Sequence, residues 1–218
     1  MADLTKQYVM TVPAPFVWNH LITPKPERTV RGMVFKAAYE ATVLFAPDHP
    51  DWVNIRSLLR ANLPAGAAEK FPVEDGTKTA DEAKAKNKDR EWARGKIRFN
   101  PHSNVKKQDG SALTPPRLVV LLNGKYVTYG TAEQPRELAT PYFYSGVLGI
   151  GTFMIDGYEG MGGGVTAYLN EVLSLNHGEK LSGSGPDAEE KYGPATDFSK
   201  YMGHVSSIDP TAGLTGLV

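Results

Sequence analysis

Apolar residues at every second position between residues 35 and 45 constrain the fold more than any other part of this sequence. The alternating positions are Phe35, Ala37, Tyr39, Ala41, Val43 and Phe45. Polar side chains, among them Lys36 and Glu40, lie between them. Because successive side chains of a strand point to opposite faces of a sheet, this period predicts a long strand with one buried and one solvated face.

Six further segments have the composition or periodicity of strands. They are residues 8–12, 96–99, 118–122, 125–129, 142–155 and 165–175. Asn123-Gly124 predicts a type I′ turn that joins the third and fourth of them into a hairpin. Gly146, Gly149 and Gly151 predict sharp bends within the fifth. Several strands, some of them bent, indicate a mainly β fold with helical insertions, either a sandwich or an OB-fold-like, partly open five-stranded barrel; we favour the barrel.

Two segments have helical features. Pro50 can occupy the first position of a helix, and Trp52, Ile55 and Leu59 follow at helical spacing. Thr79 and Glu82 have the spacing of a capping box, and the Ala/Lys-rich run over residues 80–92 predicts a solvated helix with little apolar face.

The length and composition set limits on the class of protein. With 218 residues and no cysteine, the chain can form one domain with its own core and cannot form disulfides or thiolate metal sites. We expect one domain over residues 1–203 and a flexible tail over residues 204–218. The sequence begins without a signal-peptide hydrophobic run and has no stretch long enough to span a membrane, so we expect a cytoplasmic protein with no membrane partner.

The formal net charge of zero conceals an uneven distribution of charge. Residues 78–107 contain ten lysines and arginines against four acidic residues, whereas residues 156–197 contain eight acidic residues against two lysines. A basic segment that also carries Trp92 and Phe99 fits single-stranded nucleic acid, which needs cations for its phosphates and flat rings for its bases. A charge run is, however, more often an ordinary solvated face.

Tyrosines form a second possible contact surface. Tyr126 and Tyr129 lie on one predicted strand, and Tyr142 and Tyr144 would share one face of another if that strand is regular. Such rings could stack on bases, or they could pack within the sheet, since aromatic residues favour strands in any case.

The sequence contains no clear catalytic constellation. The five histidines are scattered, and Asp48-His49-Pro50-Asp51 is better explained as a turn and helix cap than as a metal site. The glycine-rich segments 149–151 and 160–164 lack the Lys-Ser or Lys-Thr that follows a phosphate-binding loop. We therefore expect neither an enzyme nor a bound cofactor or metal.

Short motifs carry a resemblance to a known family. They are Tyr144-Ser145-Gly146, Gly164-Val165, Leu169-Asn170, residues 176–183 (Asn-His-Gly-Glu-Lys-Leu-Ser-Gly) and residues 44–50 (Leu-Phe-Ala-Pro-Asp-His-Pro). In these the chain resembles a phage family, long catalogued as a domain of unknown function, of single-stranded DNA-binding proteins with an OB-fold. The resemblance concerns scaffold residues and assigns no binding residue.

This resemblance implies a role in phage DNA replication or recombination, in the cytoplasm of an infected bacterium, with single-stranded DNA and other replication or recombination proteins as partners. One feature departs from replicative single-strand binders, which often end in an acidic tail. Residues 207–218 contain a single acid, Asp209, and the nearest acidic cluster is Asp187, Glu189 and Glu190. A role for the tail in recruitment is therefore not implied.

Together these observations predict a protein that binds single-stranded DNA without sequence preference. The residues predicted to contact the nucleic acid are Lys36, Arg90, Trp92, Arg94, Lys96, Arg98, Lys106, Lys107, Tyr126, Tyr142 and Tyr144. Lys96 and Arg98 are the best candidates to line a groove, because they alternate with Ile97 and Phe99, which should face inward. The alternative is a phage structural or assembly protein with no nucleic-acid role. The sequence leaves open the site size, the oligomeric state, and the choice between DNA and RNA and between single strands and duplex.

Overall fold

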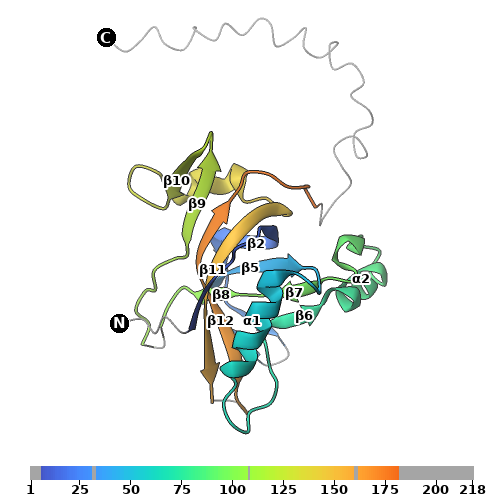
Figure 1. The fold of residues 1–218 in the computed structure, drawn as a ribbon. Helices are drawn as coiled ribbons and strands as arrows, with labels where there is room; N and C mark the ends of the chain where they lie inside the picture. Colours follow the sequence, from blue (N-terminus) through green and yellow to red (C-terminus); the bar gives the residue numbers. More distant parts are fainter. Residues whose placement is uncertain (1–5, 31–32, 108, 160–161, 182–218) are drawn as a thin grey trace, which may run out of the picture. The chain divides into compact units, whose positions relative to one another are not determined.

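Five strands close into a barrel at the centre of the fold (Figure 1). The computed structural model describes residues 6–30, 33–107, 109–159 and 162–181. The strands of the ring are β2 (Ala14–Lys25), β5 (Ala38–Phe45), β8 (His102–Asn104), β12 (Gly164–Ser174) and β11 (Val147–Tyr158), and β11 returns to pair with β2. All the pairs are antiparallel except β8–β12, which is parallel and joined through one residue pair, Tyr168 and His102. This five-stranded mixed barrel is consistent with an OB-fold, and the predicted fold class is confirmed.

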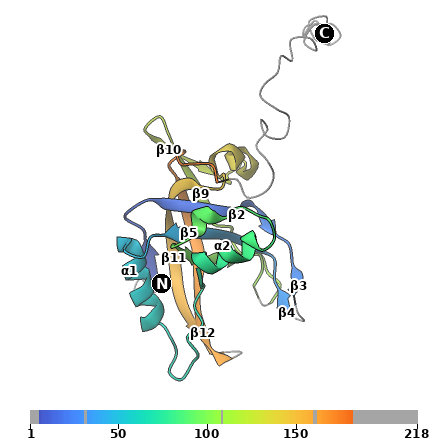
Figure 2. The same ribbon diagram turned by 90° about the vertical axis from the view of Figure 1, so that its right-hand side faces the viewer.

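Shorter strands extend the barrel. They are β1 (Gln7–Val9) beside β11, β7 (Ile97–Phe99) beside β5, β6 (Val73–Asp75) beside β7, and the hairpin of β9 (Arg117–Leu122) and β10 (Lys125–Tyr129) beside β12. A separate hairpin, β3 (Arg28–Val30) and β4 (Met33–Phe35), connects β2 to β5 and lies on the opposite side of the barrel from α1 (Figure 2). The turn between β9 and β10 has positive φ at Asn123 and Gly124, as a type I′ turn requires.

The helices confirm one prediction and correct another. Helix α1 (Pro50–Ala61) begins at Pro50 and buries Trp52, Ile55 and Leu59, as its spacing predicts. Helix α2 (Gly76–Lys84) begins before the predicted helix and ends well before Trp92. Two further helical segments in the described part of the chain are short 3₁₀ turns, η2 (Glu91–Ala93) and η3 (Arg136–Tyr142).

The predicted capping box at Thr79 is wrong, because Asp75 caps α2 instead. The Asp75 carboxylate accepts a hydrogen bond from the Thr77 backbone N–H (2.8 Å). Thr79 lies inside the helix, and its hydroxyl donates to the Asp75 carbonyl (3.2 Å).

Two predicted strands have different limits in the structure. The alternating segment 35–45 is interrupted at residues 36–37, so that Phe35 ends β4 and is exposed, while β5 holds the buried residues. The predicted strand over residues 142–155 begins only at Val147, because residues 136–142 form η3 and Gly146 adopts a positive φ. Tyr142 and Tyr144 therefore do not share a strand face. The predicted strand at residues 8–12 is observed as Gln7–Val9.

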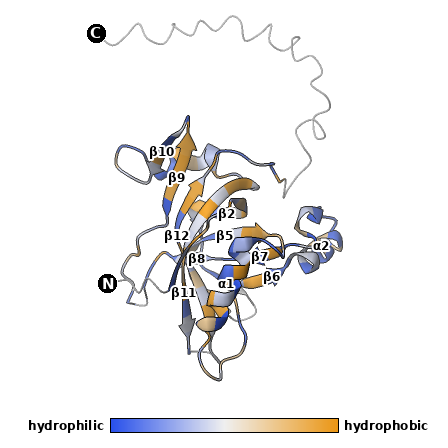
Figure 3. Cartoon of the chain, in the orientation of Figure 1, coloured by the Kyte–Doolittle hydropathy of each residue, from blue (hydrophilic) through white to orange (hydrophobic). Residues whose placement is uncertain are grey.

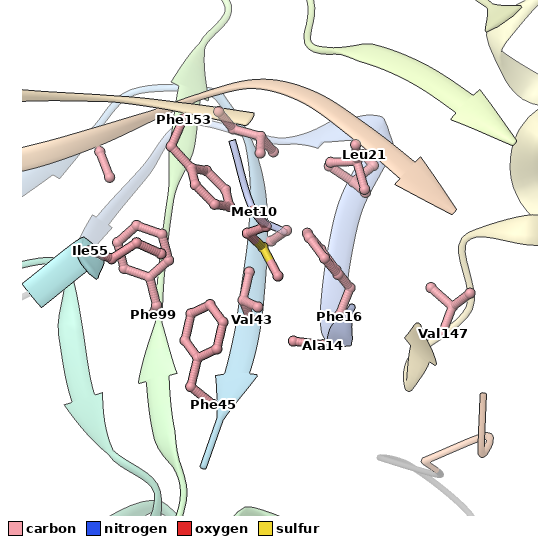
Figure 4. Close-up of a cluster of buried hydrophobic side chains, with 14 of the residues drawn as sticks. Met10, Ala14, Phe16, Leu21, Val43, Phe45, Ile55, Phe99, Val147 and Phe153 are labelled. Carbon is pink, nitrogen blue, oxygen red and sulfur yellow. The ribbon is translucent and has the colours of Figure 1, made fainter. Parts of the chain in front are cut away.

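Aromatic and aliphatic side chains fill the interior of the barrel. Phe16, Phe45, Phe99 and Phe153 are fully buried, and Phe99 meets Phe153 edge to face with ring centroids 5.1 Å apart (Figure 4). Colouring by hydropathy shows that apolar residues follow the barrel strands and that α2 is mostly polar (Figure 3). The inward orientation predicted for Phe99 is confirmed. The expected domain boundary at residues 203–204 lies outside the described residues.

Candidate nucleic-acid interface

A groove with a volume of about 740 Å³ runs over the outer face of β5 and β8, beside the β3–β4 hairpin. Five of its lining side chains are cationic, namely Lys25, Arg28, Lys36, Arg90 and Arg98, and two are carboxylates, Glu40 and Glu74. With its histidines neutral, the groove therefore carries an excess of three positive charges. Such an excess in a concave surface attracts anions.

The floor of the groove holds a row of polar side chains across three strands. His20 of β2 pairs in register with Glu40 of β5, and Glu40 pairs in register with His102 of β8. Residues directly opposite each other on paired strands point to the same face, so the three side chains form one row. The Glu40 carboxylate accepts a hydrogen bond from Lys25 Nζ (2.9 Å) and lies 3.9 Å from an Arg28 guanidinium nitrogen.

Both histidines of this row have pKa values below the ordinary histidine value. Burial lowers the pKa of His20, and the nearby Lys25 adds to that effect, although Glu40 opposes it. Burial also lowers the pKa of His102, again against the influence of Glu40. The groove therefore gains positive charge only when the pH falls below the ordinary histidine range.

An exposed aromatic ring stands at the edge of the groove on the β3–β4 hairpin. Phe35 has 41% of its surface exposed, and the Arg28 guanidinium lies over its ring at 5.3 Å from the centroid. An exposed ring next to cations is the combination on which nucleobases stack while their phosphates are neutralised.

Three of the predicted contact residues, Lys36, Arg90 and Arg98, line this groove. Arg98 is firmly held in its wall: it forms an ion pair with Glu74 and donates a hydrogen bond to the Thr79 hydroxyl (2.6 Å). Burial lowers the pKa of Arg98, an effect that Glu74 opposes. Lys36 is exposed between β4 and β5.

Trp92, Arg94 and Lys96 lie on the segment from η2 to β7, next to the groove in sequence but not among its lining residues. Trp92 and Lys96 are half-buried. Arg94 is engaged within the protein, because its guanidinium donates to Asp81 (2.8 Å) and forms an ion pair with Glu91. These hydrogen bonds raise the pKa of Arg94.

A smaller hollow of about 140 Å³ shares Arg90 and Arg98 with the groove and continues along α2. Lys86 and Lys88 line it, together with the carboxylate of Glu82. The positive surface of the groove is thereby prolonged toward the end of α2.

The other predicted contact residues are spread over different parts of the molecule. Lys106 and Lys107 are exposed on the connection from β8 to β9, where Lys106 forms a β-bridge with Ala112. Tyr126 is 69% exposed on the hairpin strand β10. Tyr142 packs against the buried Tyr129 with ring centroids 5.9 Å apart.

Tyr144 is also tied into the fold. Its hydroxyl donates to the Gly178 carbonyl (3.1 Å), and Lys180 lies 5.6 Å from its ring centroid. The structure therefore brings Lys36, Arg90 and Arg98 together in the groove, whereas Tyr126, Tyr142 and Tyr144 are not among the residues that line it.

Sequence reasoning missed the contribution of the β2–β5 connection, which supplies Lys25, Arg28 and Phe35. Phe35 continues the alternation of the following strand, and that alternation predicts a buried ring. The signal available in the sequence is a pair of short strand-like runs, Arg28–Val30 and Met33–Phe35, on either side of Gly32. That pattern is typical of a hairpin.

Among the described residues no group of three His, Asp or Glu side chains is placed to hold a metal ion. The same part of the chain contains no helix that is both long and apolar enough to cross a membrane.

Solved structures of phage single-stranded DNA-binding proteins have a similar fold. The protein from bacteriophage Enc34 superposes with a TM-score of 0.56 at 16% identity, covering 86% of this chain and 90% of that one. The same phage protein in complex with single-stranded DNA gives 0.57 at 15% identity, covering 82% and 90%. Gp2.5 of bacteriophage T7 gives 0.49 at 12% identity, covering 86% and 93%. No family model matches the sequence, and no curated protein matches it.

Proposed function

We propose that this protein binds single-stranded DNA without sequence preference and that the strand lies in the groove over β5 and β8. The observation that carries the proposal is the joint presence of five cations and the exposed Phe35 on this face. OB-folds bind oligonucleotides on the face of their second and third strands and on the loop between the first and second. In the present barrel those parts are β5, the β7–β8 segment and the β3–β4 hairpin.

The structural neighbours support this function. The Enc34 protein, which has the same fold, has been solved in complex with single-stranded DNA. By analogy we propose that this chain coats exposed strands during phage DNA replication or recombination and works there with other phage proteins.

The path of the strand follows from the distribution of charge. It runs from Arg28 and Phe35 on the hairpin, past Lys36 and Arg98, to Arg90, and continues toward Lys86 and Lys88. Trp92, Arg94 and Lys96 flank this path, and we propose that Trp92 offers a further stacking surface. Lys106, Lys107 and the three predicted tyrosines remain candidates for contacts outside the groove.

The proposal is tested by measuring binding of the full chain to fluorescent oligo-dT and to a duplex of equal length over a range of salt concentrations. We expect tighter binding to the single strand than to the duplex, and quenching of tryptophan fluorescence on binding. If all five groove cations contact phosphates, a plot of log affinity against log salt concentration should have a slope of about −3.5. Equal affinity for oligo-dT and mixed sequences would show the absence of sequence preference. No binding at low salt would overturn the proposed function, and tighter binding to the duplex would overturn its single-strand specificity.

A further inference from the structure

The carboxylate of Glu40 is held among the cations of the groove. It lies on β5 at the middle of the polar row, with His20 on one side and His102 on the other. Lys25 from the end of β2 and Arg28 from β3 form ion pairs with it.

The ion pairs of Glu40 with Lys25 and Arg28 are partly exposed to solvent. The side chains of Lys25 and Glu40 are 32% and 31% exposed, and that of Arg28 is 35% exposed. Ion pairs that remain in contact with water contribute little to stability, so replacing one partner of such a pair costs little free energy. The pair of Arg98 with Glu74 differs, because the Arg98 side chain is only 14% exposed and is also bonded to Thr79.

A carboxylate and a phosphate make the same kind of charge-assisted hydrogen bonds with lysine and arginine. A cation that is already neutralised by a protein carboxylate offers less to an incoming phosphate. Glu40 therefore competes for the cations that the DNA backbone would use, whereas Glu74 mainly fixes Arg98 in the wall.

We infer that Glu40 occupies the place of a DNA phosphate between Lys25 and Arg28, and that a bound strand displaces it. This inference rests on the proposed function and assigns to Glu40 the control of affinity in that groove. The strand must supply phosphates in place of the Glu40 carboxylate, so Glu40 weakens binding to all sequences alike.

The first test compares Glu40→Gln with the unaltered protein in binding to oligo-dT at about pH 8, above the ordinary histidine pKa of about 6.5. We expect about fivefold tighter binding, because Glu40→Gln frees one unit of positive charge on Lys25 and Arg28 to interact with a phosphate a few ångströms away in water. The matched control is Glu171→Gln, which removes an equally exposed carboxylate (34%) that pairs with Arg117 (3.1 Å) outside the groove. That control makes the same change in net charge and should leave the affinity unchanged.

The second test is a double-mutant cycle with Lys25→Gln and Arg28→Gln. If Glu40 acts by holding these cations, the gain from Glu40→Gln disappears when both are replaced. Thermal melts of every variant check that folding is intact. The inference is overturned if Glu40→Gln binds no tighter, if Glu171→Gln gains as much, or if the gain persists without the two cations.

The two proposals fail in different ways. If the unaltered protein and Glu40→Gln both leave oligo-dT unbound at low salt, the proposed function is wrong. If the unaltered protein binds and only the effects of Glu40→Gln are absent, single-strand binding stands and the role of Glu40 is wrong.

Discussion

At the scale of single residues, a buried carboxylate anchors the N-terminal strand to helix α1. Asp51 is fully buried. It accepts hydrogen bonds from the Tyr8 hydroxyl (2.6 Å), from the Thr11 backbone N–H (3.0 Å) and hydroxyl (3.0 Å), and from the Val12 backbone N–H (2.8 Å). The sequence around Asp51 predicts a turn and helix cap, and the structure shows that the Asp51 side chain instead fixes residues 8–12.

The pKa values of this cluster reflect its geometry. Burial alone would raise the pKa of Asp51, but the hydrogen bonds from Tyr8, Thr11 and Val12 hold it below its ordinary value. Burial and the bond to Asp51 raise the pKa of Tyr8 to about 12. The folded protein therefore favours the ionised carboxylate and the neutral phenol.

We predict that Asp51→Asn lowers the free energy of unfolding by about 2 kcal/mol, because donors that met a carboxylate are left with a weaker acceptor. Since the pKa of Asp51 is lower in the folded state, its contribution is present above the ordinary aspartate pKa and is lost as the pH falls through the folded value. Urea denaturation of the unaltered protein and of Asp51→Asn at a series of acid pH values should show this loss of unfolding free energy only in the unaltered protein. Asp48→Asn, an exposed carboxylate in the same turn, is the control, and an equal loss in both variants would contradict the prediction.

The histidines of the groove predict that DNA binding strengthens on acidification. His20 and His102 have lowered pKa values when the groove is empty, and a bound phosphate favours their protonated forms. Affinity for oligo-dT should rise as the pH falls below about 6.5. At the same time the unfolding free energy falls, because a histidine whose pKa is lowered in the folded state takes up its proton more readily in the unfolded chain.

Replacing both residues in His20→Gln/His102→Gln should remove most of the pH dependence of binding, as measured by fluorescence anisotropy. His177→Gln changes an exposed histidine outside the groove and should leave the pH dependence intact. An unchanged pH profile in the double variant would show that other groups are responsible.

At the scale of elements, the β3–β4 hairpin carries the exposed ring of Phe35, which we propose as the stacking surface. We predict that Phe35→Ala weakens binding to oligo-dT by about 1 kcal/mol or more, which is the contribution of one stacked base. The melting temperature should hardly change, because the ring is exposed. Leu138→Ala removes a side chain of similar exposure (55%) on η3 and serves as the control. A weaker affinity in Tyr126→Ala with no change in Phe35→Ala would place the strand over the β9–β10 hairpin instead.

The segment after α2 prolongs the positive surface. We predict that Lys86→Gln/Lys88→Gln weakens binding to long oligonucleotides and reduces the salt slope by about 0.7 for each phosphate that these lysines neutralise. Short oligonucleotides that fill only the groove should bind as before. Lys125→Gln on β10 is the matched surface control. If the salt slope is the same in Lys86→Gln/Lys88→Gln as in the unaltered protein, the bound strand does not extend beyond Arg90.

At the scale of the whole molecule, the parts predicted from sequence are those that depend on local periodicity. Helix α1 and the β9–β10 hairpin follow from spacing and turn chemistry. The number of strands and the bend glycines indicate a mainly β fold and favour a barrel, but they do not by themselves separate a barrel from a sandwich. The alternation from Phe35 to Phe45 continues through a break at residues 36–37, and periodicity cannot detect such a break.

The groove proposed as the binding face depends on contacts between distant parts of the chain. The row of His20, Glu40 and His102 exists only because β2, β5 and β8 pair in that register. The basic segment led to Arg90 and Arg98 because its charges lie close together in the sequence. Lys25 and Arg28 belong to the same groove but lie far away in the sequence, in a short basic segment of their own: residues 25–36 contain four lysines and arginines against one acidic residue.

The single residue pair that joins β8 to β12 has a consequence for the dynamics of the barrel. A ring of strands opens most easily where the fewest backbone hydrogen bonds hold it, so β8 should exchange its amide hydrogens with solvent faster than β11. His102, on the floor of the groove, is one half of this pair. A strand of DNA lying across β5 and β8 would thus hold β8 in place where the barrel has the fewest backbone contacts. The protein with bound DNA would then be more rigid and would have a higher melting temperature.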